Sequence, residues 1–75
     1  MTIATLELIH HLLKEDLYQQ EATRDRRRAE LNQRRGEIDD GAPGDDIIEK
    51  QACDEAYDVW RRTKQALEDF EAQEF

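Results

Sequence analysis

The chain has 75 residues, with 19 Asp and Glu against 11 Lys and Arg, so its formal net charge is −8. This length permits one small domain and excludes a TIM barrel or a complete dinucleotide-binding fold. A single cysteine cannot form an internal disulfide bond, and one cysteine with two histidines is a poor inventory for a zinc site.

The apolar residues follow a pattern, although 40% of the chain is charged, and this favours a folded protein over a disordered one. Large apolar side chains gather in residues 1–18 and 47–75, whereas only Leu31 and Ile38 lie between those segments. No stretch approaches the ~20 apolar residues of a membrane span, and the N-terminus lacks the basic region of a secretory signal. We therefore expect a cytoplasmic protein that does not enter a membrane. Its acidic balance argues against nucleic acid as a partner.

Residues 2–38 are predicted to form one long helix, which Thr2 or Thr5 can cap by accepting a backbone N–H. Four apolar residues near its start recur at intervals of three and four: Leu6, Ile9, Leu13 and Leu17. This spacing places them on one helical face. The alternative is a break near residue 19, after which residues 1–18 would fold back as a separate helix.

Residues 39–44 carry the strongest turn signal, because two glycines and the only proline fall within four of them. A second helix is predicted over residues 45–73, with Asp45 as its N-cap. Its expected apolar face comprises Ile48, Ala52, Ala56, Val59, Ala66, Leu67 and Phe70, broadened by Cys53, Tyr57 and Trp60. A short loop between two helices gives an antiparallel hairpin. The predicted fold is therefore all-α, with residues 1–75 as a single helical-hairpin domain.

The hairpin places a basic segment opposite an acidic one. The basic segment, called here the arginine block, contains Arg24, Arg26, Arg27, Arg28, Arg34 and Arg35. Nine acidic residues lie between positions 37 and 58. With the turn centred near residue 42, the numbers of facing residues should sum to about 85, which places Arg27 opposite Asp58 and Arg35 near Glu49. Exposed ion pairs contribute ~0–1 kcal/mol each, so we expect these pairs to set the register more than the stability.

The same register leaves residues 2–11 without a partner in their own hairpin. A two-helix unit of this size also buries too little surface to be stable alone. We therefore expect a homo-oligomer, either a dimer or a tetramer, and the simplest form is a dimer that makes a four-helix bundle of coiled-coil type. The predicted interface residues are Ile3, Leu6, Ile9, Leu13, Leu17, Tyr57, Trp60, Leu67 and Phe70.

Candidate chemical sites are weak. Glu7 and His10 have the Glu-x-x-His spacing of di-metal helical bundles, but the expected register does not bring Glu68 or Glu71 level with Glu7. The chain has no serine, and Cys53 lies far from both histidines, so no nucleophile is paired with a base. We expect no enzymatic activity, no metal site and no cofactor. The arginine block is a candidate polyanion contact, although the facing acids neutralise it and no aromatic residue is interleaved for base stacking.

Two segments, one near each end of the sequence, resemble segments of known proteins. TLELIHHLLKED (residues 5–16) and ALEDFEAQEF (residues 66–75) resemble the opening and closing segments of small uncharacterised helical proteins of phages and prophages of Gram-positive bacteria. Those proteins have a variable charged middle and often end in Trp, where this chain has Phe75. The resemblance covers about 22 of the 75 residues. It implies an accessory phage or prophage protein, and it carries over no functional residue.

These observations predict a non-enzymatic, oligomeric interaction protein. Its charged faces could also bind an unidentified protein partner. The alternative is a phage protein that counters a host defence or binds a host enzyme. It would act through the arginine block or through an acidic face that mimics nucleic acid.

Overall fold

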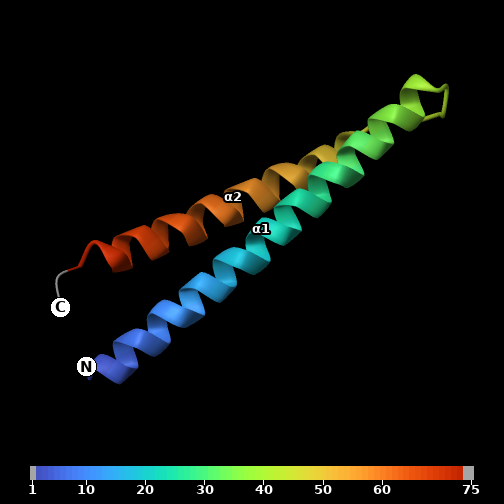
Figure 1. Ribbon diagram of the computed structural model, residues 1–75. Coiled ribbons are helices and arrows are strands. Elements are labelled where there is room, and N and C mark those ends of the chain that lie inside the picture. Colours follow the sequence, from blue (N-terminus) through green and yellow to red (C-terminus); the bar gives the residue numbers. More distant parts are fainter. Residues whose placement is uncertain (1, 74–75) are drawn as a thin grey trace.

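A computed structural model describes residues 2–73 of the chain. Over these residues it contains two helices and no strand: α1 (Ile3–Asp39) and α2 (Ile47–Glu71). The helices run antiparallel, so the start of α1 and the end of α2 both lie away from the loop (Figure 1). The all-α, two-helix prediction is confirmed. Three residues lie outside the described range: Met1, Glu74 and Phe75, the last two of which end the segment 66–75 quoted for the resemblance.

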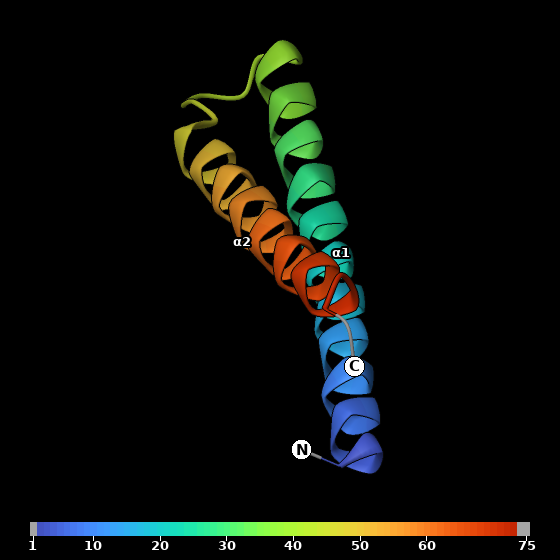
Figure 2. The same ribbon diagram turned by 90° about the vertical axis from the view of Figure 1, so that its left-hand side faces the viewer.

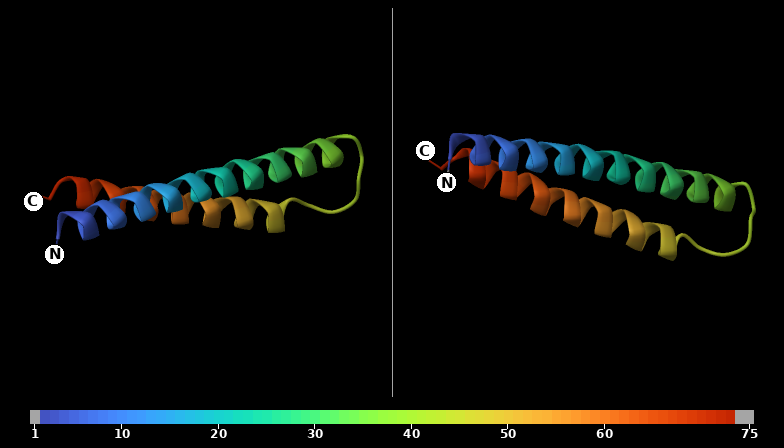
Figure 3. Two further views of the ribbon diagram at one scale, coloured as in Figure 1. Left: turned by 60° about the horizontal axis from the view of Figure 1, so that its bottom comes forward. Right: turned by 90° about the horizontal axis from the view of Figure 1, so that it is seen from below.

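The hairpin is a rod of 59 × 14 × 13 Å. The two helices cross at a shallow angle, as the views in Figure 2 and Figure 3 show. The alternative in which residues 1–18 fold back is wrong for the described residues 2–18, because α1 continues without a break through residue 19. At its start, the Thr2 hydroxyl accepts the backbone N–H of Thr5 at 3.2 Å, as expected for an N-cap.

One face of each helix forms the seam between them. In α1 the seam residues are Leu6, His10, Leu13, Leu17, Gln20, Arg24, Arg27, Leu31, Arg34 and Ile38. In α2 they are Glu49, Cys53, Ala56, Trp60, Thr63, Leu67 and Phe70. All of them are buried or half-buried, and they recur at alternating intervals of three and four, which is a seven-residue repeat.

The seam contains a small core. The buried side chains are Leu31, Cys53, Ala56 and Leu67, each 6–7% exposed. Glutamine and arginine hold four of the ten seam positions of α1, so polar side chains fill much of the middle of the hairpin. The predicted apolar face of α2 was partly wrong, because Ile48 is 77% exposed and Val59 is 40% exposed. Both residues are displaced to one side of the seven-residue repeat.

The register also differs from the prediction. His10 contacts Glu71, Glu21 contacts Trp60, and Arg35 contacts Asp46. The numbers of facing residues therefore sum to about 81 instead of about 85, a shift of roughly one helical turn. The prediction that residues 2–11 lack a partner is wrong at its C-terminal end, where His10 packs against α2.

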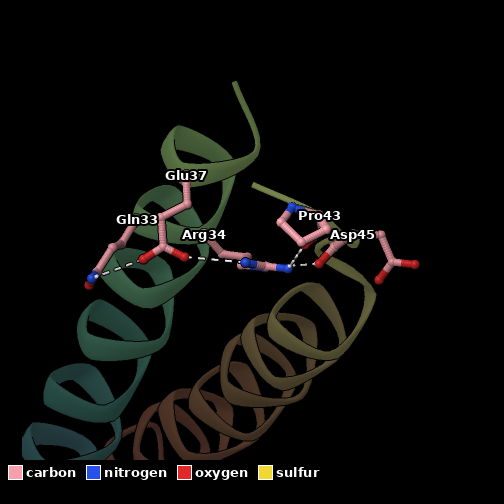
Figure 4. A network of polar contacts seen from close by, with 5 residues as sticks. All are labelled: Gln33, Arg34, Glu37, Pro43 and Asp45. Carbon is pink, nitrogen blue, oxygen red and sulfur yellow. Dashed lines mark hydrogen bonds and ion pairs between the residues drawn. The ribbon is translucent and has the colours of Figure 1, made fainter. Parts of the chain in front are cut away.

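The loop explains this shift, because it turns back beside the last turn of α1 (Figure 4). Arg34 donates hydrogen bonds to two loop carbonyls, those of Pro43 at 2.8 Å and Asp45 at 3.1 Å. A third hydrogen bond, 3.3 Å long, joins Arg34 to the carboxylate of Glu37, which also accepts from Gln33 at 3.5 Å. Helix α2 consequently starts level with Arg34 and its neighbour rather than beyond the end of α1.

The end of α1 at the loop has a defined C-cap, whereas the N-cap residue of α2 makes no side-chain capping bond. The N–H of Gly41 donates to the carbonyl of Ile38 at 3.0 Å, and that of Ala42 donates to the carbonyl of Glu37 at 2.9 Å. This pair is a Schellman motif, which requires the positive φ of 101° at Gly41. The N-cap of α2 is Asp46, one residue later than predicted. The carboxylate of Asp45 still accepts the N–H of Ile47 at 3.2 Å.

Two glycines should respond oppositely to alanine. Gly36 lies within α1 with nothing near the position of an added Cβ, so Gly36→Ala should stabilise the protein by about 0.5–1 kcal/mol. Gly41→Ala should destabilise it by about 1–2 kcal/mol, because the left-handed region disfavours a side chain. Thermal unfolding followed by circular dichroism measures both. Equal shifts of the two variants would contradict the Schellman motif.

Candidate functional site

Trp60 lies at the centre of a cluster of contacts between the two helices. The guanidinium of Arg24 sits 4.4 Å from the centroid of its ring system, and the ammonium of Lys64 lies 5.2 Å from it. Arg24 also lies 5.8 Å from the ring of Tyr57. The indole N–H of Trp60 donates to the carboxylate of Glu21 at 3.3 Å. Cation–π contacts of this kind contribute about 0.5–2 kcal/mol, so the cluster stabilises the polar middle of the seam.

The arginine block does not form one surface. Arg24 packs on Trp60, Arg34 holds the loop, and Arg35 pairs with Asp46 across the hairpin. Arg26 and Arg28 are exposed. The sequence missed this division because it depends on which arginines fall on the seam, and polar residues there interrupt the apolar pattern.

The predicted ion pairs between the helices were mostly wrong. Arg27 binds Glu30 of its own helix at 3.0 Å, and Asp58 pairs with Arg62 of its own helix. Arg35 does pair across the hairpin, but with Asp46 instead of Glu49. Carboxylates three or four residues away on the same helix are the nearer partners, so most of these arginines are satisfied locally.

Arg35 donates a hydrogen bond of 2.8 Å to the carboxylate of Asp46. This hydrogen bond, helped by the attraction between the two charges, holds the pKa of Asp46 below its ordinary value of about 3.9. The pair therefore ties the start of α2 to the last turns of α1 with the carboxylate ionised.

Asp46→Asn tests this pair through pH. A lowered folded-state pKa stabilises the protein above the unfolded pKa of about 3.9, and this contribution is lost as the pH falls through the folded value. We expect the variant to be less stable than the wild type at pH 7, and the difference to shrink as the pH falls below about 3.9. Thermal unfolding at several pH values measures it. A difference that stays constant with pH would rule out the ionised pair.

His10 of the Glu-x-x-His motif packs against α2. His10 stacks on Phe70 with ring centroids 5.8 Å apart, and its Nε2 lies 3.1 Å from the carboxylate of Glu71. An open cavity beside this contact is lined by Ile3, Leu6, Glu7, His10 and Phe70. Across residues 2–73, no group of three or more His, Cys, Asp or Glu side chains could hold a metal ion. Neither helix, as far as it is described, is long and apolar enough to cross a membrane.

The residues predicted as an oligomer interface lie mainly along the seam. Leu67 is buried, while Leu6, Leu13, Leu17, Trp60 and Phe70 are half-buried seam residues. Ile9 and Tyr57 are half-buried beside the seam, and Ile3 is exposed. The predicted interface set does not include six large apolar residues that the fold leaves exposed: Leu8, Leu12, Tyr18, Ile47, Ile48 and Val59. All six lie outside the seven-residue repeat of the seam, and this is the feature by which the sequence distinguishes them.

The two long sides of the hairpin differ in chemistry. One side, called here the charged flank, carries Glu7, Lys14, Glu21, Arg28, Arg35, Lys50, Tyr57, Lys64 and Glu71. The opposite side, called here the mixed flank, carries Ile9, Asp16, Thr23, Glu30 and Glu37 of α1 and Ala52, Val59 and Ala66 of α2, with Leu12, Arg26, Ile48, Glu55 and Arg62 at its rim. An open groove on the mixed flank is lined by Gln20, Thr23, Arg27, Ala52, Glu55, Ala56 and Val59.

No family model matches the chain, and comparisons with curated proteins and with solved structures find no match either.

Proposed function

We propose that this chain is a non-enzymatic interaction protein whose folded unit contains at least two hairpins, packed as a four-helix bundle of coiled-coil type. The observation that carries the proposal is the area left exposed. One hairpin exposes 5800 Å², whereas a compact monomer of 8.9 kDa exposes about 4,800 Å². The excess of about 1,000 Å² is close to the ~800 Å² that each partner buries in a standard protein interface.

The exposed apolar side chains support the same proposal. Seven large apolar residues are at least 40% exposed, while only four side chains of the described hairpin are buried apolar ones. A small domain with so little core is marginal by itself, and association is one of the ways in which such domains become stable. The apolar residues outside the seam can therefore supply burial that the seam lacks.

Mass in solution tests the proposed assembly. Size-exclusion chromatography with light scattering at micromolar concentration should give at least twice the 8.9 kDa of one chain, together with the circular dichroism of a highly helical protein. A well-folded monomer would contradict the proposal.

The biological setting belongs to the same proposal. The resemblance of the terminal segments to small phage and prophage proteins supports an accessory role in a phage or prophage. Cys53 is a free, buried thiol, which suits a reducing compartment, so the cytoplasm is the proposed location.

A second candidate function is the binding of a host protein through Arg26 and Arg28. Arg28 makes no hydrogen bond or ion pair with any described residue, and Arg26 is 63% exposed with its nearest carboxylate 4.0 Å away. Both guanidinium groups are therefore available to the carboxylates of a partner. Replacing both with Glu should abolish capture of that partner from host lysate, whereas Lys50→Glu combined with Arg61→Glu, the same change of charge on exposed residues of α2, should not. An unchanged partner would exclude this role.

A further inference from the structure

We draw no further inference here: the strongest candidate, the open cavity between the start of α1 and the end of α2 that is lined by Ile3, Leu6, Glu7, His10 and Phe70, carries nothing, because nothing in the structure shows what covers it.

Discussion

Leu67→Ala is expected to unfold the hairpin at micromolar concentration. Leu67 is 7% exposed and is one of only four buried apolar residues. Truncating a buried leucine to alanine costs about 2–5 kcal/mol. A core of this size rarely supplies more than about 3–5 kcal/mol, so the loss is comparable with the whole stability. Far-UV circular dichroism should show most of the helical signal gone at 25 °C.

Leu8→Ala is the matched control for this substitution. Leu8 is 56% exposed on the back of α1, away from the seam and from both flanks. The same chemical change there should alter stability by no more than about 0.5 kcal/mol. If the Leu67→Ala protein melted within a few degrees of the Leu8→Ala protein, the seam would not be the core.

Val59→Asp is expected to dissociate the assembly. Val59 is 40% exposed and lines the open groove beside the seam, so a proposed assembly that covers this groove would bury the introduced carboxylate of each chain. The burial of charge opposes association. The dissociation constant of the dimer should rise at least 100-fold, which corresponds to about 2.7 kcal/mol.

Gln65→Asp makes the same change of charge on the back of α2, where the side chain is exposed. Sedimentation velocity across a dilution series should leave this control dimeric and show Val59→Asp as a monomer with reduced helicity. Equal dissociation constants for the two variants would place the interface elsewhere.

The sequence predicts the two helices and the loop because each depends on local signals. Thr2 caps α1, and the Gly-Ala-Pro-Gly segment interrupts helix formation. The register could not be predicted, because it depends on two hydrogen bonds from Arg34 to backbone carbonyls of the loop. Backbone acceptors have no sequence signature. An estimate from the centre of the turn therefore missed the displacement of one helical turn.

The residues of the seam could not be predicted from the sequence for a different reason. Its seven-residue repeat passes through Gln20, Arg24 and Arg27, which a pattern of apolar residues does not include. Arg24 belongs to the seam because its flat guanidinium packs on Trp60 of the other helix. The prediction treated the arginines as one charged face, although their roles depend on which of them point toward α2.

The solution mass of the wild-type chain, measured together with its helicity over a wide range of concentration, tests the central claim most directly. Sedimentation equilibrium and circular dichroism on the same samples are sufficient. We predict a mass of at least twice 8.9 kDa at micromolar concentration, and a loss of helicity that accompanies dissociation on dilution. A mass of 8.9 kDa with full helicity at every concentration would contradict the account.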